Sequence, residues 1–240
     1  MTGATPDNLR RLAEADALLL LAEWLHRPPT GSSATDPVTD NDLSMLATAC
    51  GFERGSTTEI ALRRTAQARR TVAWAQWEAE RSRLFEGAAV CPPNETAYVR
   101  RDKGAILGDL AGFYRAFGFD QDHGVGEKHD HVVSQLQFAA ILLVMLARAH
   151  GEDQVEHEKI TREALQAFAF DHLGLWIGLF CERLIETAEH PSFSELGAAL
   201  LGAWRAVCAD NDLPTPEVAE IEPITGAAGS PYECDGCPSI

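Results

Sequence analysis

Residues 129–150, with the sequence HDHVVSQLQFAAILLVMLARAH, decide the fold class of this chain. The second half of this stretch is apolar on almost every side of a helix, which is typical of a helix buried at the centre of a bundle. Its longest uncharged apolar run, Phe138–Ala147, has ten residues, whereas a membrane-spanning helix needs roughly 20. We therefore predict a buried central helix and no membrane insertion.

The rest of the chain continues the helical pattern on both sides of this stretch. Apolar residues recur with a period close to 3.6, and strand-like alternation is absent over any useful length. The sequence therefore predicts an all-α protein. Further helices are expected over 7–26, 39–51, 57–85, 102–117, 154–172, 174–189 and from Pro191 onward, the last opened by a capping box of Ser192 and Glu195. In the first helix the inward residues should include Leu9, Leu12, Ala13, Leu20 and Trp24.

The chain has 240 residues, which is enough for one domain with a sizeable core. We predict a single helical bundle domain over residues 1–210. Prolines, glycines and acidic residues replace the periodic pattern from Asn211 onward, so residues 211–240 should form a flexible acidic C-terminal tail. Residues 30–37 and 118–128 are predicted to be loops.

The formal net charge of −16 argues against a nucleic-acid-binding protein, because such a chain repels phosphate and attracts cationic partners. Arginines between 63 and 83 do lie beside Trp74 and Trp77, but interspersed glutamates indicate a solvated helix face. The apolar stretch Leu18–Leu21 is short, follows acidic residues and lacks a small-residue cleavage site, so we expect a cytoplasmic protein.

A cluster of titratable residues, Glu127-Lys128-His129-Asp130-His131, precedes the central helix. It contains two imidazoles and two carboxylates, which can bind a metal or pair Asp130 with a histidine as a general base. Nothing nearby completes a catalytic set. The structural alternative is that Asp130 is the N-cap of the helix and that the histidines are exposed.

Two further groups of residues have candidate chemistry. Phe168, His172 and Trp176 are spaced by four and should share a buried helix face, with His172 paired inside the core. Cys234-x-x-Cys237 supplies two thiolates, whereas a tetrahedral zinc site needs about four ligands. This pair is therefore half of a site shared in a dimer, a redox pair or incidental, and we expect no stoichiometric metal in the monomer.

Several motifs in order along the chain resemble the TorD/DmsD/NarJ family of redox-enzyme maturation chaperones. They are Pro92-Pro93-x-x-Thr96-x-Tyr98, Phe113-Tyr114, Gly118-Phe119, Glu127-x-x-Asp130-His131 and Phe168-x-x-x-His172-Leu173-x-x-Trp176. The resemblance covers about residues 7–210. Two features depart from the family pattern, namely His129, where many members have proline, and the tail that contains Cys234 and Cys237.

The resemblance implies a TorD/DmsD-like helical bundle that is a cytoplasmic chaperone and not an enzyme. Its partner would be the catalytic subunit of a molybdenum-cofactor oxidoreductase, often bound at a twin-arginine signal peptide and held until the cofactor is inserted. Asp130 and His131 would bind or position this client, and Glu127 would support them. Pro92, Pro93 and Tyr98 would shape an adjacent hinge. The chaperone itself would carry no cofactor and would be a monomer or homodimer.

Two other classes of protein remain open at this point. A small helical metal-binding protein or metal-dependent hydrolase would use His129, Asp130 and His131. A redox or metal-storage protein would use Cys234 and Cys237.

Overall fold

The protein is described by a computed structural model, which covers residues 5–26, 38–119 and 128–216. These residues form α-helices, one 3₁₀ turn, one π turn and no strand beyond a single isolated bridge, which confirms the all-α prediction. The elements are α1 Pro6–His26, α2 Asp40–Ala49, α3 Thr57–Thr71, α4 Trp74–Phe85, η1 Glu95–Ala97, α5 Lys103–Ala116, α6 Val132–Gly151, α7 Val155–Phe168, η2 Ala169–Leu173, α8 Gly174–Thr187 and α9 Pro191–Asp210.

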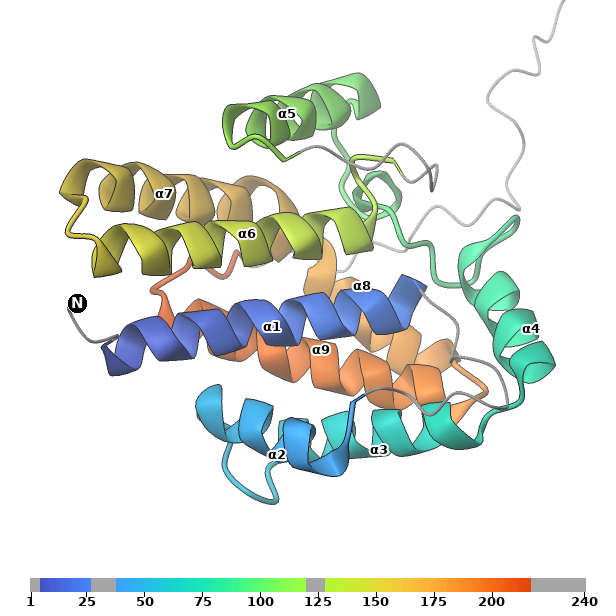
Figure 1. Cartoon of the computed structure of the whole chain (residues 1–240). Coiled ribbons are helices and arrows are strands. Elements are labelled where there is room, and N and C mark those ends of the chain that lie inside the picture. Colours follow the sequence, from blue (N-terminus) through green and yellow to red (C-terminus); the bar gives the residue numbers. More distant parts are fainter. Residues whose placement is uncertain (1–4, 27–37, 120–127, 217–240) are drawn as a thin grey trace, which may run out of the picture.

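The bundle is built around α6, which lies between α1 and α7 (Figure 1). Helix α9 packs against α1, α3 and α8, and α5 covers the side of α6 and α7 away from α1. Phe138, Leu142 and Leu146 of α6 are completely buried. The apolar composition of residues 129–150 therefore reflects their place in the core.

Two helical spans in the described residues are long and apolar enough to cross a membrane by length and composition alone, Val132–Gly151 and Val155–Thr187. The first is α6, and 72% of its most apolar window is buried inside the bundle. The second joins α7, η2 and α8, and its large apolar residues Phe168, Trp176 and Phe180 are buried in the same core. Burial among the other helices is sufficient to explain both compositions.

The single helix predicted over 57–85 is wrong, because the chain breaks between α3 and α4. Val72 and Ala73 have extended backbone angles, with ψ of 134° and 141°. Thr71 and Val72 are consecutive β-branched residues, which disfavour helix. The break lets α4 turn so that Trp77 stacks on Phe193 of α9, with 5.8 Å between the ring centroids.

The sequence predicts a break between two helices near residue 173, but the structure has no loop there. The π turn η2 joins α7 directly to α8. Gly174 makes this geometry possible. A Cβ atom at Gly174 would lie only 2.2 Å from the carbonyl oxygen of Ala169, so a side chain there would force the turn to open.

The structural alternative for Asp130 and one predicted cap are both wrong. The N-cap of α6 is His131 and not Asp130, because the Asp130 carboxylate bonds to a different segment. The N-cap of α9 is His190 and not Ser192, because the ring Nδ1 of His190 accepts from the amide of Ser192 and Pro191 occupies the first helical position. Thr39 caps α2 and Asp102 caps α5, where helices were predicted to begin.

The buried face of α1 differs from the predicted one. Leu9 and Leu12 are 55% and 37% exposed, although both were expected to face inward. The buried face instead follows Ala15, Leu18 and Ala22, because α1 packs against both α6 and α9 and small residues allow the helices to approach closely. Ala13 and Trp24 are buried as expected.

The described chain extends past the predicted boundary at residue 210. Asn211 is buried, and its Nδ2 donates a hydrogen bond of 2.8 Å to Glu14 Oε2 on α1. Leu213 is buried as well. Residues 217–240, with Cys234 and Cys237, lie outside the described residues, as do Glu127 and most of the two predicted loops.

Candidate functional site

The double-proline segment and the Asp-His motif meet in a short antiparallel pairing, which we call the loop bridge and define as residues 93–96 and 130–132. Asn94 and His131 form the isolated β-bridge. Val132 N donates to Pro93 O over 2.8 Å, and Glu95 N donates to Asp130 O over 2.9 Å. Proline has no backbone donor, so Pro93 takes part through its carbonyl alone. The pairing places the start of α6 beside η1.

Asp130 lies inside the loop bridge and is fully buried. Its Oδ1 accepts a hydrogen bond of 3.0 Å from Asn94 Nδ2. Its Oδ2 accepts from Thr96 Oγ1 at 2.7 Å and from Thr96 N at 3.4 Å. Both carboxylate oxygens are thus occupied by the chain itself, so Asp130 holds the loop bridge together and does not face solvent.

His131 is partly exposed and caps α6, because its ring Nδ1 accepts a hydrogen bond of 3.2 Å from Val133 N. An accepting Nδ1 places the proton of the neutral ring on Nε2. His131, Pro93 and Val132 line a shallow depression together with residues from the end of α1 and from α4, which are Leu25, His26, Arg81 and Phe85. We call this surface the His131 surface. Its enclosed volume of about 10 Å³ has room for about one water molecule.

Charge on the His131 surface comes from Arg81. The guanidinium of Arg81 bonds to the carboxylate of Glu86 and lies 5.9 Å from the ring centre of Trp77. The hydrogen bond to Arg81 lowers the pKa of Glu86, so Glu86 remains a carboxylate and compensates the positive charge. The depression therefore combines apolar side chains with imidazole and a neutralised arginine.

Behind the loop bridge lies a second set of buried polar residues, which we call the Glu95 network. Glu95 is fully buried, and its carboxylate accepts from Gln135 Nε2 at 2.6 Å and lies 3.2 Å from His172 Nδ1. Gln135 Oε1 accepts from Trp176 Nε1 at 3.1 Å. The prediction that His172 is a paired core histidine is therefore confirmed.

No sequence motif identified Glu95 or Gln135 as a site residue. One signal is visible for Gln135, which is a polar residue on the apolar helix α6 and is completely buried. A buried polar side chain must find a partner. Glu95 gives no comparable signal, because its partners His172 and Gln135 lie 77 and 40 positions away.

Two tyrosines support the site from within the core. Tyr98 is buried, and its ring stacks on Trp176 with 5.3 Å between centroids. Tyr114 of α5 donates a hydrogen bond of 2.7 Å to the carbonyl of His129. Burial raises the pKa of both phenols, so they remain neutral and act as packing groups and hydrogen-bond donors.

The family model for the nitrate reductase delta subunit matches residues 53–182, which is more than half of the chain. The chain belongs to this family. It is the family of NarJ/TorD-like maturation chaperones for molybdoenzymes, and the resemblance inferred from the motifs is thus confirmed. A comparison with individual curated proteins finds no significant match.

The span matched to the delta subunit family contains both the loop bridge and the Glu95 network. The structure brings Pro93, Asp130 and His131 together, with half-buried Pro92 next to them. Tyr98 lies deeper, against Trp176 and Cys91. Glu127 lies outside the described residues, so its place relative to this site remains a prediction.

The geometry gives no support to a metal site at His129, Asp130 and His131 in this delta subunit family member. The ring of His129 packs against Tyr114, His131 caps α6, and both Asp130 oxygens point at Asn94 and Thr96. In the described ranges, no three histidine, cysteine or acidic side chains lie close enough together to hold a metal ion.

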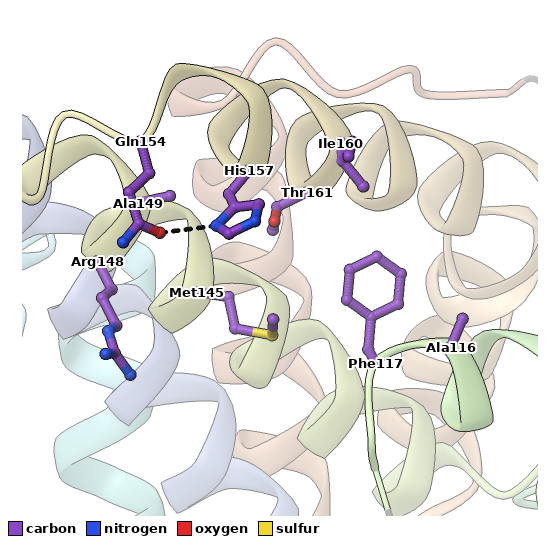
Figure 2. A pocket seen from close by; sticks show the side chains of 9 residues that line it. All are labelled: Ala116, Phe117, Met145, Arg148, Ala149, Gln154, His157, Ile160 and Thr161. Carbon is purple, nitrogen blue, oxygen red and sulfur yellow. Dashed lines mark hydrogen bonds between the residues drawn. The ribbon is translucent and has the colours of Figure 1, made fainter.

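A larger cavity of about 460 Å³ lies near the other end of α6, between α5, α6 and α7. Figure 2 shows Met145 and Phe117 on one side of it, with His157 and Ile160 above them. The Nδ1 atom of His157 lies 2.7 Å from Gln154 Oε1. The sequence did not point to this cavity, which depends on how three helices diverge.

Proposed function

We propose that this chain is a system-specific cytoplasmic chaperone that binds the catalytic subunit of one molybdoenzyme and holds it until the molybdenum cofactor is inserted. Membership of the delta subunit family supports the general maturation role. The observation that supports the site is the loop bridge, where a buried and fully bonded Asp130 holds the half-buried His131 at the surface, with the buried Pro93 behind it in the wall of the depression. The chain acts by binding and carries out no catalysis.

The residues around the loop bridge divide into two roles in this proposal. His131 and Phe85 of the His131 surface, which are both half-buried, contact the client. Asp130 acts as a positioning residue, because a fully buried carboxylate with three internal donors cannot reach an incoming peptide without breaking the pairing. The resemblance implied that Asp130 binds or positions the client, and this division assigns it the positioning role.

We further propose that a twin-arginine signal peptide is one form of the client that binds here. Such a peptide has a basic stretch followed by an apolar one. The net charge of −16 steers the basic stretch toward the protein, and the apolar stretch packs on the His131 surface. Pairing of Arg81 with Glu86 removes the local repulsion that a free guanidinium would cause.

Calorimetric titration tests this function. The purified chain is titrated with the cofactor-free catalytic subunits of molybdoenzymes from the same organism, and separately with the signal peptide of each subunit where one exists. We expect saturable binding of the subunit, with affinity that falls as salt is raised because steering by net charge is screened. Absence of binding to the cofactor-free subunit at micromolar concentrations would contradict the proposed function.

The signal-peptide proposal has its own outcome in the same experiment. Binding of the subunit together with no binding of its isolated peptide would leave the maturation role intact and remove the peptide from the proposal. A peptide in which both arginines are replaced by glutamine is the matched control. Its loss of affinity relative to the native peptide should be larger at low salt than at moderate salt.

A further inference from the structure

We propose that Glu95 is a positioning residue for client binding, acting through the loop bridge without touching the client. This inference rests on the proposed function of the His131 surface. Glu95 joins three parts of the fold. Its backbone amide bonds to Asp130 O, and its carboxylate bonds to Gln135 on α6 and lies within hydrogen-bond distance of His172 on the π turn η2.

The directions of two hydrogen bonds in the Glu95 network, from Trp176 to Gln135 and from Gln135 to Glu95, are fixed by chemistry. The indole nitrogen of Trp176 can only donate, so the side-chain oxygen of Gln135 must face it. The amide nitrogen of Gln135 then points at Glu95 as a donor. Glu95 must therefore accept on this side, and its other contact is with His172 Nδ1.

This arrangement explains why an acid and not an amide stands at Glu95. A glutamine side chain has one accepting oxygen, so its amide group would face either Gln135 or His172 as donor against donor. A change of tautomer at His172 would relieve that conflict only by placing a proton on Nε2, which is buried and has no hydrogen-bond partner among the described residues. Either outcome leaves a buried donor unpaired, which is costly.

The Glu95 network can influence the His131 surface because one backbone hydrogen bond, from Glu95 N to Asp130 O, joins the network to the residue before His131. Glu95 N, Asp130 O and the pair Val132 N and Pro93 O form consecutive rungs of the loop bridge. Displacement of the Glu95 side chain moves its backbone amide, which loosens the rung to Asp130. His131 then loses the fixed position that the client requires, at an affinity cost of about tenfold or more if one such bond is lost.

A pair of single variants and their combination tests this inference. Glu95→Gln introduces the donor conflict described above, and Gln135→Glu places two carboxylates 2.6 Å apart where one hydrogen bond stood. The double variant moves the acid by one position in the network. The new carboxylate at position 135 would accept from both Trp176 and the new amide at position 95. The oxygen of that amide would accept from His172, so every bond is restored with the same number of charges.

Two measurements are made on each variant. The first is amide hydrogen exchange at positions 95 and 132 in the free protein, which reports the two rungs of the loop bridge. The second is affinity for the cofactor-free catalytic subunit. We expect faster exchange and about tenfold weaker binding in each single variant, and recovery of both in the double variant. Glu14→Gln, which alters another buried acid remote from the bridge, should change neither.

Each other outcome contradicts the inference. Unchanged exchange at Val132 in Glu95→Gln would show that Glu95 does not hold the bridge, whatever the client does. Unchanged client affinity in Glu95→Gln, with tight binding by the wild type, would overturn the positioning role while the proposed function stands. If the single variants fail to fold, a folded double variant with fast exchange at Val132 or weak binding would overturn it as well.

Discussion

Thr96 donates two hydrogen bonds to one oxygen of Asp130, from its hydroxyl at 2.7 Å and from its amide at 3.4 Å. These bonds join the double-proline segment to the Asp-His motif, which lies 34 positions further along the chain. Asp130 thus holds the loop bridge together from inside the protein, and its neighbour His131 lines the surface of the site.

Replacement of Asp130 by asparagine should destabilise the protein. Asparagine has the same shape, but it has one accepting oxygen and no charge, so its amide group either faces the Thr96 backbone donor or requires Asn94 to reverse its side-chain amide, and the charge-assisted hydrogen bonds are lost in both cases. We expect the free energy of unfolding to fall by about 1–3 kcal/mol, as for a buried polar group left unsatisfied. The measurement is urea unfolding, in which the midpoint should fall while the dependence of the unfolding free energy on urea concentration stays unchanged.

The same variant distinguishes a positioning role from direct charge recognition. If Asp130 contacted a basic client directly, Asp130→Asn would leave stability unchanged and would weaken binding mainly at low salt. The structure predicts the opposite pattern, in which stability falls and the loss of affinity is nearly independent of salt. Thr96→Ser keeps both donors and should resemble the wild type in both assays.

Protein stability should depend on pH through Glu14. Burial raises the pKa of Glu14 from an ordinary 4.5 to about 8, and a hydrogen bond from Asn211 partly offsets this. The folded protein therefore binds one proton more than the unfolded chain between these values. The contribution of Glu14 to stability is complete below about pH 4.5 and is lost as the pH rises toward about 8.

The expected slope is a loss of about 1.4 kcal/mol per pH unit within that window, since one proton is involved. Urea unfolding of wild type and Glu14→Gln from about pH 5 to about pH 9 measures it. The difference between the two proteins should grow with pH and level off above about pH 8. A difference that is constant over the whole range would show that Glu14 titrates normally. Cys50 and Cys208 lie near Glu14, but their pKa values of about 12 keep them out of this window.

Two truncations should locate the end of the folded domain. Removal of residues 217–240 should leave the midpoint of thermal unfolding within about 2 °C, which is less than about 1 kcal/mol for a protein of this size. Removal of residues 211–240 also deletes the buried residues Asn211 and Leu213, and leaves Glu14 without its hydrogen bond. That deletion should lower the midpoint by at least about 4 °C. Equal thermal midpoints of the two truncated proteins would support a domain boundary at residue 210.

Local patterns were sufficient to predict most of the helices. The apolar surface of residues 132–151 identifies α6 without reference to the rest of the chain. Thr39 and Asp102 act as N-caps because a short oxygen-bearing side chain precedes each helix. Such features depend on residues within a few positions of one another, so the sequence contains them directly.

The failures depend on contacts between distant parts of the chain. The break at Val72 is stabilised by Trp77 packing on Phe193 of the last helix. Asp130 was an equally good N-cap by local criteria, but Asn94 and Thr96 compete for its oxygens. Leu9 fits an amphipathic pattern, yet α1 is buried along a different face because two helices pack on it.

The sequence located only part of the candidate site, because the site also depends on contacts between distant parts of the chain. The motifs identified Pro93, Asp130 and His131, which do meet in space. They did not reveal that Asp130 is buried, nor that Glu95 and His172 are partners across 77 positions. A carboxylate in a motif predicts importance, but only the fold determines whether it faces a client or the interior.

The measurement that tests the central claim most directly is client titration of His131→Asn. Asparagine is as good an N-cap as any residue, so the start of α6 should be preserved while the imidazole is removed from the His131 surface. We predict an unfolding midpoint close to that of the wild type and about tenfold or greater loss of affinity for the cofactor-free catalytic subunit. His157→Asn, an exposed change near the other end of α6, is the control and should bind like the wild type. Equal affinities of wild type and His131→Asn would contradict the assignment of the loop bridge as the client-binding site.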